Sequence, residues 1–574
     1  MVWIINLECY TMFKLNPIQI AFIALLFTGI GGVGSYYLKM PAPGTTHYSS
    51  PLSQPVTDNY TPESHPKTSQ QSIDTIKSKK KRRTKSLRFH KKKNHQKTTV
   101  DATHAESSSI HLAFTSLKEE TSAPQKLRIT GKIPAWLQGE LLRTGPALFE
   151  HNNSQAYAFF DGCALLHHFS CDQGNITYHN HYLRSKYWDQ VHNQEKFGMH
   201  TETKGGLFSK IGSLLKDSEP TYDNGASDIC YIDEKFCAIT ETPLYHTFDP
   251  KDFSQQGLLN FDDNLSAQYT CAHLHKDNKT GDLYGYAIQF GNTSTYIPYK
   301  IKAQSTKRIP LAKINVSYPA YMHSFAYTEH YLVFIEPPFR VNPVDLLLGN
   351  KSFLETYVWY PKQKTNILVL DKCTGNTVGK FNAPPLFYLH HINAYEQAGK
   401  LIVDVPVYED QSIVSSFNLQ PYREGKNPII PKAKPTRFTI DLQNNQLDLQ
   451  ALSEMSLEMP QINYEVAHGK PYTFVYGTHI PADQTIMTHL IKLNVTDGNT
   501  LLWHEEGCYP GEPVFVAAPT GTAEDDGVLL SVVLDTRTGT SFLLILDART
   551  MQECARAHLT HHIPLDSHGH FYKR

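Results

Sequence analysis

Residues 527–548 read GVLLSVVLDTRTGTSFLLILDA, two apolar runs separated by a short polar stretch. The polar stretch, Thr536–Gly539, ends in glycine, which readily adopts the backbone conformations of tight turns. Each flanking run is long enough for a strand and too short for a typical helix. The pattern therefore predicts a β-hairpin whose turn is Thr536–Gly539.

Comparable apolar runs follow one another from about residue 126 to the end of the chain. Clear examples are LYGYAIQF at 283–290, YLVFIE at 331–336, NILVLD at 366–371, KLIVDVPVY at 400–408 and PYTFVYG at 471–477. Few amphipathic helices interrupt them, although residues 341–360 suit a helical insertion or a loop. So many strands exceed one β-sandwich, whereas a β-propeller accommodates them by radial repetition of small sheets. We expect an all-β propeller, and the pattern alone does not give the number of blades.

The composition of the 574 residues indicates a large folded body with a basic tail. Hydrophobic residues make up 40% and charged residues 19%, which excludes wholesale disorder. Residues 1–100 carry a net charge of +11, so the other 474 residues carry −12 to give the total of −1. A mildly acidic body argues against a nucleic-acid enzyme, and we expect no nucleic-acid partner. The nine cysteines form no CxxC pair, which argues against a zinc ribbon or a disulfide framework.

The N-terminal segment 18–38, IQIAFIALLFTGIGGVGSYYL, has 21 residues without a charge. This length is sufficient for one transmembrane helix. A signal sequence is the rival interpretation, because MPAPG follows at 40–44. We expect residues 1–40 to form an uncleaved, single-pass membrane anchor.

Residues 41–115 contain Pro, Ser, Thr, Gln and His with little apolar periodicity, which predicts a disordered linker. The segment 77–93 within it, KSKKKRRTKSLRFHKKK, is strongly basic. Either this segment is simply solvated, or it attracts anionic membrane lipid. Because basic segments favour the cytoplasmic side of a membrane, we expect the body at 116–574 to be cytoplasmic.

Four of the 29 histidines lie on or beside β runs with apolar and aromatic neighbours. They are His273, His323, His390 and His568. Neutral imidazole is a common ligand of first-row transition metals, so four such rings converging on a propeller axis would form an all-nitrogen metal site. Intervals of 50, 67 and 178 residues match no short metal motif, and ordinary hydrogen-bonded or surface histidines remain the alternative.

Three glutamates also occur in apolar surroundings: Glu241, Glu458 and Glu512. Burying a carboxylate is costly unless it is paired. Accepting the free N–H of a metal-bound imidazole would pair the carboxylate and orient the ring. Capping backbone amides in a turn is the alternative role for each of them.

These segments together resemble the carotenoid cleavage oxygenase family, from about Leu127 to the carboxyl end. The matching motifs occur in order over about 440 residues, and together they are specific. They are GKIPAWLQGELLRTGPALFE (131–150), FFDGCALLHHF (159–169), AHLHKDNKTGDLYGY (272–286), MHSFAYTEHYLVF (322–334), HHINAYE (390–396) with LIVD, MPQIN (459–463), GEPVFV (511–516) and the terminal HG (568–569).

Three departures from the family pattern stand out. FFDG replaces an aromatic–His pair before FDG, and HLHKDN replaces the common His–Pro. The last motif reads DSHGHF where an apolar aromatic residue usually precedes the histidine. This change puts Asp566 near the expected metal site, where it either points away or alters the local potential.

The resemblance implies a seven-bladed β-propeller with a helical or loop dome over one face. It also implies that the four histidines hold Fe(2+) near the axis and that the three glutamates hydrogen-bond three of them. Ser227, in DNGASDICY, matches the position beside the open side of the metal. Cleaving members of the family often carry a small hydroxyl residue there, whereas the isomerohydrolase carries a bulkier apolar one.

The implied activity is that of an iron(II) dioxygenase that uses O2 to cleave a conjugated C=C bond of a carotenoid or apocarotenoid. A stilbene-like phenylpropanoid is the second enzymatic option for the substrate. A retinoid isomerase is a third option, against which Ser227 argues. A propeller that binds a lipid without catalysis is the non-enzymatic alternative, and the retention of all seven site residues argues against it.

Overall fold

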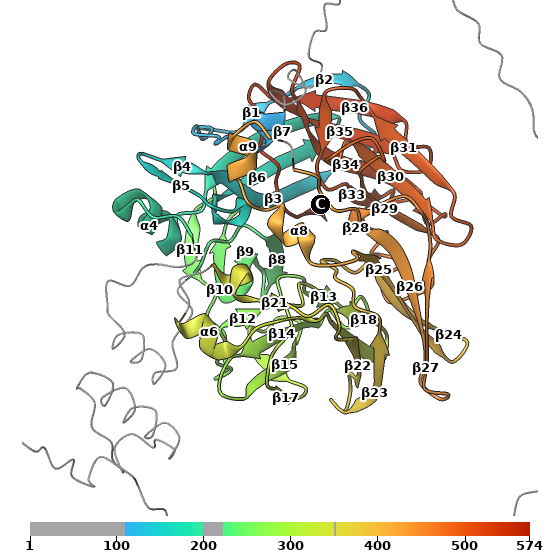
Figure 1. The fold of residues 1–574 in the computed structure, drawn as a ribbon. Coiled ribbons are helices and arrows are strands. Elements are labelled where there is room, and N and C mark those ends of the chain that lie inside the picture. Colours follow the sequence, from blue (N-terminus) through green and yellow to red (C-terminus); the bar gives the residue numbers. More distant parts are fainter. Residues whose placement is uncertain (1–109, 199–221, 349–351, 427) are drawn as a thin grey trace, which may run out of the picture. The chain divides into compact units, whose positions relative to one another are not determined.

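The computed structural model of the protein describes residues 110–198, 222–348, 352–426 and 428–574. In this part of the chain, seven sheets of four to six strands fan out around a common centre (Figure 1). The expected all-β, seven-bladed propeller is therefore confirmed. We number the sheets as blades 1–7.

The strands of blades 1–4 are as follows. Blade 1 contains β1 (Gln125–Lys126), β7 (Asn175–Tyr182), β6 (Cys163–Asp172), β3 (Gly139–Leu148) and β37 (Gly569–Lys573). Blade 2 contains β8 (Asp228–Ile232), β9 (Lys235–Thr240), β10 (Thr242–Phe248) and β11 (Gln255–Leu258). Blade 3 contains β12 (Tyr269–Thr270), β13 (His275–Lys276), β14 (Leu283–Gln289), β15 (Ser294–Ile301), β16 (Arg308–Pro310) and β17 (Ile314–Val316). Blade 4 contains β18 (Ala326–Tyr327), β19 (Tyr331–Glu336), β22 (Thr365–Asp371) and β23 (Thr377–Ala383).

The strands of blades 5–7 complete the circle. Blade 5 contains β24 (Asn393–Gln397), β25 (Lys400–Val407), β26 (Lys434–Asp441) and β27 (Gln446–Ala451). Blade 6 contains β28 (Glu458–Gln461), β29 (Phe474–His479), β30 (His489–Asn494) and β31 (Thr500–His504). Blade 7 contains β2 (Arg128–Gly131), β36 (Glu553–His558), β35 (Thr540–Asp547), β34 (Gly527–Asp535), β32 (Cys508–Pro510) and β33 (Val514–Ala517).

Both ends of the described chain close the ring. The C-terminal strand β37 pairs with β3 of blade 1, and β2, from the amino-terminal side, pairs with β36 of blade 7. Apolar side chains then pack between these two blades, among them Leu141 and Phe169 against Leu530 and Ile545. Sheet edges that are paired in this way leave fewer unsatisfied backbone groups, which stabilises the closed ring.

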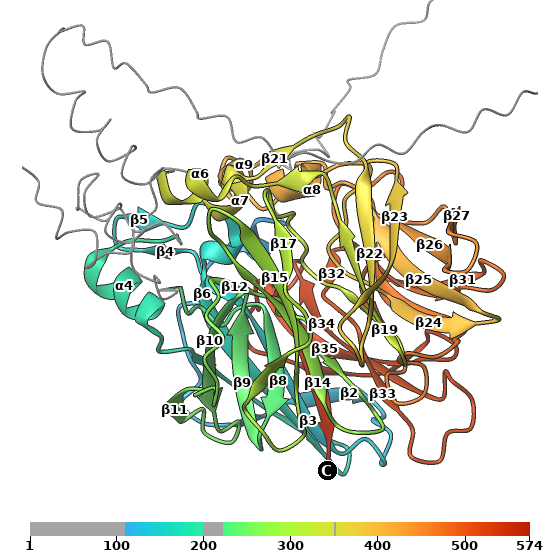
Figure 2. The same cartoon turned by 90° about the horizontal axis from the view of Figure 1, so that it is seen from below.

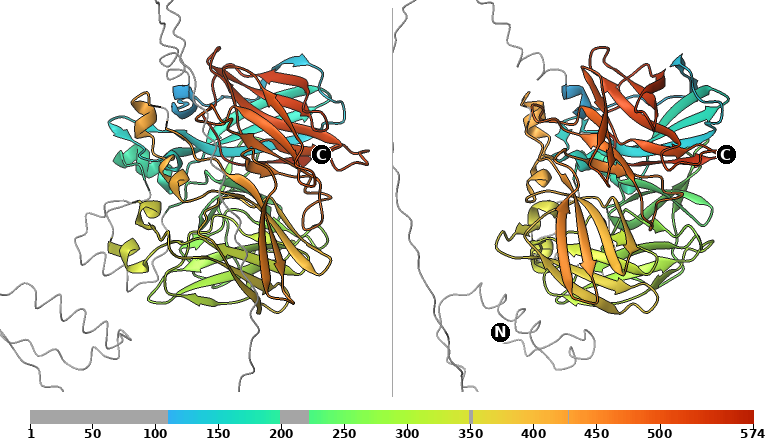
Figure 3. Two further views of the ribbon diagram at one scale, coloured as in Figure 1. Left: turned by 45° about the vertical axis from the view of Figure 1, so that its right-hand side comes forward. Right: turned by 90° about the vertical axis from the view of Figure 1, so that its right-hand side faces the viewer.

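One face of the propeller carries most of the helices (Figures 2 and 3). These are α6 (Pro343–Leu348), α7 (Phe353–Thr356), α8 (Ser412–Ser415) and α9 (Gln420–Arg423), together with the ribbon of β20 (Phe339–Arg340) and β21 (Val358–Trp359). Phe339, Tyr357 and Ile413 from these insertions pack in one apolar cluster with Tyr269 and Phe387 of the blades. The expected helical insertion in 341–360 is part of this dome.

The remaining elements lie around blade 1. They are the 3-10 helices η1 (Ile110–Phe114) and η2 (Phe159–Asp161), the helix α4 (Lys186–Gln194) and the ribbon of β4 (Glu150–His151) and β5 (Ser154–Gln155).

The hairpin predicted in 527–548 is confirmed. Strands β34 and β35 pair antiparallel along their length, and Gly539 in the turn has a φ of +68°. The predicted strand at 471–477 begins only at Phe474. At this boundary the backbone N–H groups of Thr473 and Phe474 donate to the Glu524 carboxylate.

The amino-terminal boundary of the body differs from the expected residue 116. Ile110 and Ala113 of η1 are buried in the apolar cluster beneath the dome, and the Leu565 N–H donates to the Ala113 carbonyl. Residues 110–115, assigned to the linker by their composition, therefore pack with the body. Their apolar residues span only Ile110–Phe114, which is too short a stretch to show a periodicity at the end of a polar segment.

The predicted anchor at residues 1–40 and the basic segment at 77–93 lie outside the described residues. Among the described helices, none combines the length and the apolar character needed to cross a bilayer. The eight cysteines in the described part are all free, as expected from the absence of a CxxC pair.

Candidate metal centre

The four predicted histidines come together at the centre of the ring of blades. His273 lies between β12 and β13, whereas His323, His390 and His568 each precede an innermost strand, β18, β24 or β37. Figure 1 shows β8, β13, β18, β28 and β33 around this centre. One ring nitrogen from each of the four histidines lies within 4.8 Å of those of the other three. Radial repetition thus explains why ligands that meet in space have no common sequence spacing.

The rings are arranged so that nitrogens, not ring faces, meet. The Nε2 atoms of His273 and His323 are 2.9 Å apart, and those of His390 and His568 are 3.1 Å apart. Interplanar angles between neighbouring rings run from 71° to 89°. Edge-on rings of this kind can direct four lone pairs at one point.

Each predicted glutamate hydrogen-bonds the Nδ1 of one histidine in this cluster. The distances are 2.8 Å from His323 to Glu241, 2.6 Å from His390 to Glu458 and 2.8 Å from His568 to Glu512. An ionised carboxylate only accepts hydrogen bonds, so Nδ1 carries the hydrogen and donates it, and Nε2 of the neutral ring is left with a lone pair. The three carboxylates therefore fix both the tautomer and the orientation of three rings.

This donor set fits a transition-metal ion. In their neutral forms, His390 and His568 donate Nδ1–H to a carboxylate, which leaves two Nε2 lone pairs facing each other at 3.1 Å. A cation between the two lone pairs would turn that repulsion into coordination. Neighbouring ligands on a metal–nitrogen bond of about 2.1 Å lie about 3.0 Å apart at a right angle, which matches the observed separation.

The surroundings shift the pKa values of these groups in different directions: those of His273 and His390 are lowered, whereas that of His568 is raised, because Glu512 outweighs the opposing effect of burial. Burial lowers the pKa of His273 well below its usual range, and the neighbouring imidazoles lower it further. Burial also lowers the pKa of His390, although Glu458 opposes this. For Glu512, burial opposes ionisation, but His568 and Arg143 outweigh it and bring the carboxyl pKa to about 2. Neutral imidazole is the form that binds metal.

Two buried tyrosines hold Glu241. The Tyr269 hydroxyl donates to Glu241 Oε1 at 2.7 Å, and the Tyr321 hydroxyl lies 3.0 Å from the same oxygen. Burial and the Glu241 charge raise the pKa of both phenols well above its ordinary value, so both remain protonated donors. These tyrosines were not identified from the sequence, in which 32 tyrosines give no reason to single out two.

The backbone around Glu458 bends to aim this carboxylate at His390. The next residue, Met459, has a φ of +51°, and the pairing of β28 with β29 is irregular between Glu458 and Gln461. The Met459 N–H donates to Glu458 Oε2 at 2.8 Å. The MPQIN segment is therefore an irregular strand that positions an acid.

Glu512 belongs to a buried network with Arg143 and Asp566. Arg143 is fully buried and binds Asp566 through two hydrogen bonds, of 2.5 Å from Nε and 2.9 Å from Nη2. Its Nη1 lies 3.5 Å from Glu512 Oε2, and Gln461 donates to Glu512 Oε1 at 2.9 Å. Asp566, the departure noted in the last motif, thus pairs with a buried arginine.

Ser227 and His391 also have defined places. The Ser227 hydroxyl is buried 3.3 Å from the Thr240 hydroxyl, and the His568 N–H donates to the Ser227 carbonyl. This backbone hydrogen bond places Ser227 beside His568, one of the four clustered histidines. His391 Nδ1 lies 2.7 Å from the Ser324 hydroxyl, so His390, not His391, is the member of the HH pair in the cluster.

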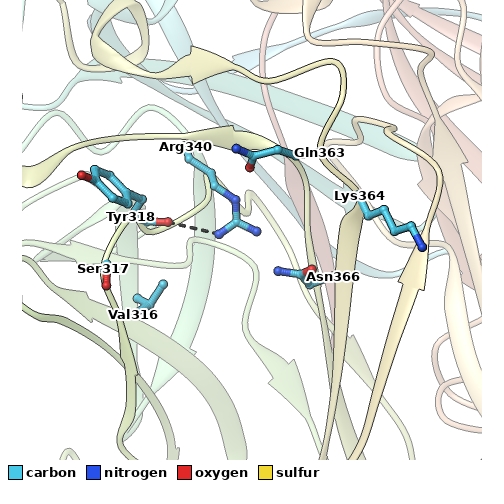
Figure 4. A pocket seen from close by; sticks show the side chains of 7 residues that line it. All are labelled: Val316, Ser317, Tyr318, Arg340, Gln363, Lys364 and Asn366. Carbon is cyan, nitrogen blue, oxygen red and sulfur yellow. Dashed lines mark hydrogen bonds between the residues drawn. The ribbon is translucent and has the colours of Figure 1, made fainter.

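A separate surface pocket of about 430 Å³ lies between blades 3 and 4. Figure 4 shows its lining, in which the Arg340 guanidinium donates to the Tyr318 carbonyl at 3.1 Å. Lys364, Gln363 and Asn366 add further polar groups. This pocket contains none of the site residues.

Comparison with known proteins covers most of the chain. A family model described as retinal pigment epithelial membrane protein matches residues 114–573. The carotenoid isomerooxygenase of Galleria mellonella is 31% identical over 492 residues, which cover 80% of this chain and 96% of that protein. The beta,beta-carotene 15,15'-dioxygenase of Rattus norvegicus is 31% identical over 520 residues, with 80% and 91% covered.

Solved structures support the fold. The crystal structure of a cobalt-substituted apocarotenoid oxygenase of Synechocystis superposes with a TM-score of 0.72 at 24% identity, and covers 82% of this chain and 99% of that one. The family resemblance drawn from the motifs is confirmed: this chain is a member of the retinal pigment epithelial membrane protein family, to which the carotenoid oxygenases belong.

Proposed function

We propose that this protein is a metal-dependent dioxygenase that cleaves a conjugated C=C bond of a carotenoid or apocarotenoid with O2. The observation that carries the proposal is the convergence of four histidine rings, three of them fixed by a carboxylate at Nδ1. The named activities of the relatives, carotene dioxygenase and carotenoid isomerooxygenase, agree with it. The reaction balances when both atoms of O2 enter the products, which gives two carbonyl compounds from one double bond.

The Nε2 atoms of the four histidines are the proposed ligands of Fe(2+). A set of neutral nitrogen ligands leaves the ion its full charge, and four ligands leave room for other molecules on an octahedral ion. When bound, ferrous iron supplies the electron density that activates O2. The glutamates keep a proton on Nδ1 of their histidines throughout, so that these rings present the same lone pair in every turnover.

The other task of the protein is to place the polyene and exclude water. The apolar cluster beneath the dome contains Tyr269 and Tyr321, which also bind Glu241, so apolar packing reaches the edge of the histidine cluster. Phe339 and Tyr357 of the dome belong to the same cluster. An apolar hydrocarbon chain suits these surroundings better than a charged substrate does.

Ser227 is proposed to lie beside the open side of the metal, where its small side chain leaves space for O2. The carbonyl of Ser227 accepts the N–H of His568, which keeps this residue next to one proposed ligand. Space at that position favours oxidative cleavage over isomerisation.

Membrane attachment is a further part of the proposal. Residues 18–38 are uncharged and residues 77–93 are basic, and both features favour a membrane surface as the location of the body. Carotenoids partition into membranes, so an anchored enzyme would meet its substrate there.

The test is incubation of the anaerobically purified full chain with a panel of carotenoids and apocarotenoids under 18O2. We expect two carbonyl products, each with one 18O atom, from at least one substrate. Cleavage of a stilbene alone would move the substrate class to phenylpropanoids, and a change of double-bond geometry alone would indicate an isomerase. Bound polyene without any product would support a lipid-binding propeller instead.

A further inference from the structure

His273 differs from the other three histidines of the cluster because no glutamate holds its Nδ1. Within the described residues, no hydrogen bond reaches this atom, whereas its Nε2 lies 2.9 Å from His323 Nε2. The acid that comes within ion-pair distance of Nδ1 in the described part is Asp228, with Oδ2 at 3.8 Å. Asp228 is the first residue of β8 and is buried.

The two oxygens of Asp228 have different surroundings. Oδ1 accepts the Ile229 N–H at 2.7 Å and His570 Nε2 at 3.0 Å. Among the described residues, no donor binds Oδ2, the oxygen that faces His273. A carboxylate oxygen has lone pairs for further hydrogen bonds, so this geometry leaves Asp228 Oδ2 able to accept one more donor.

The tautomer of His273 decides whether it is that donor. His323 uses its Nδ1 proton for Glu241, so its Nε2 is an acceptor, and the 2.9 Å contact places the proton of His273 on Nε2. To offer Nε2 to a metal, His273 must carry this proton on Nδ1 instead. Asp228 Oδ2 is then the acceptor in reach, and a movement of about 0.9 Å brings the pair to hydrogen-bond distance.

We propose that Asp228 is a fourth positioning carboxylate, which accepts the Nδ1–H of His273 when the centre holds a metal, while His570 keeps Asp228 in place. The inference rests on the proposed metal centre. With Asp228 in this role, every histidine of the cluster has an acid at Nδ1, and all four rings are held in orientation. Loss of such a partner typically weakens metal binding 10- to 100-fold.

The test uses the full chain loaded with Co(2+), whose paramagnetism shifts the proton resonances of ligand imidazoles. Four exchangeable N–H resonances that vanish in D2O are expected, one for each histidine. In Asp228→Asn the N–H resonance of His273, the fourth of these, is expected to exchange at least 10-fold faster. Metal dissociation into a chelator is expected to accelerate 10- to 100-fold. Asp172→Asn, an exposed acid at the end of β6, is the matched control and is expected to leave both unchanged.

A second variant guards against a folding defect in Asp228→Asn. His570 is half exposed, so His570→Ala is expected to fold and to accelerate exchange of the same fourth resonance. If Glu458→Gln accelerates metal loss while both Asp228→Asn and His570→Ala match the wild type, the role of Asp228 is overturned and the metal centre stands. If the wild type takes up no cobalt, the metal centre itself fails, and this inference with it.

Discussion

Replacing Asp566 by Asn removes one charge from a buried ion pair. Arg143 has a side chain with 0% exposure and Asp566 one with 3%, and two hydrogen bonds join them. Removing one partner of such a pair leaves an uncompensated buried charge and costs about 3–5 kcal/mol. In the variant, Glu512 remains at 3.5 Å from Arg143, and Asp228 also acts on its charge.

The variant is expected to have two consequences. The free energy of unfolding falls by about 3–5 kcal/mol, which denaturant titration measures through the midpoint at an unchanged slope. Arg143 also competes with His568 for Glu512, so metal dissociation accelerates about 10-fold or more. Burial opposes the charge of Arg143, but Glu512 and Asp228 remain in the variant and raise its pKa. An arginine side chain is not deprotonated in proteins, so the buried charge is not relieved by loss of a proton.

Two controls isolate the buried pair. Glu454→Gln breaks the exposed ion pair with Lys434, which is 2.7 Å long, and is expected to cost less than about 1 kcal/mol. The double variant Arg143→Gln with Asp566→Asn removes both charges and is expected to be more stable than Asp566→Asn alone. A loss for Asp566→Asn as small as that for Glu454→Gln, or a double variant no more stable than the single one, would refute the reasoning.

Four further predictions follow from the centre. His390→Ala is expected to remove the metal and activity while circular dichroism still reports the propeller; normal turnover would end the four-histidine account. Glu458→Gln keeps the shape of the side chain but removes its charge, and is expected to weaken metal retention about 10- to 100-fold. Retention equal to that of the wild type would mean that Glu458 only shapes the backbone turn. Ser227→Val fills the space beside the cluster, so cleavage is expected to fall at least 10-fold with metal content unchanged, and unchanged cleavage would contradict this placement. Glu512 ionises with a pKa of about 2 in the fold against an ordinary 4.5, so it stabilises the protein fully above about pH 4.5 and this contribution is lost as the pH falls towards 2. Over that pH range, the free energy of unfolding is expected to decline less steeply in Glu512→Gln than in the wild type. Parallel curves for the two proteins would contradict the depressed pKa.

The strands could be predicted well because their signal is local. The hairpin at 527–548 needs only two apolar runs and a glycine turn, and both strands form as the pattern indicates. The number of blades is not local: blade 7 takes β2 from the amino-terminal side and blade 1 takes β37 from the carboxyl end. The family resemblance, rather than the periodicity, supplied the number seven.

The site could be predicted only in part, for the same reason. The motifs singled out the four histidines and three glutamates, but not which acid binds which ring. Each pair joins segments far apart in the chain, such as Glu241 with His323 and Glu512 with His568. Arg143 and Asp566 are 423 positions apart, so their pairing shows only in three dimensions.

Asp228 was missed because it adjoins Ser227, on which the sequence argument concentrated. An aspartate at the start of a strand is an ordinary residue, and its meaning comes from the 3.8 Å approach to His273.

The central claim is that four histidines bind one metal ion, and X-ray absorption at the iron edge tests it most directly. The full chain is purified without oxygen and its iron is quantified before the spectrum is recorded. We predict about one iron per chain with four imidazole nitrogens at about 2.1 Å in the wild type, and no bound iron in His390→Ala. A wild-type protein without iron, or iron whose imidazole count is the same in both proteins, would contradict the account.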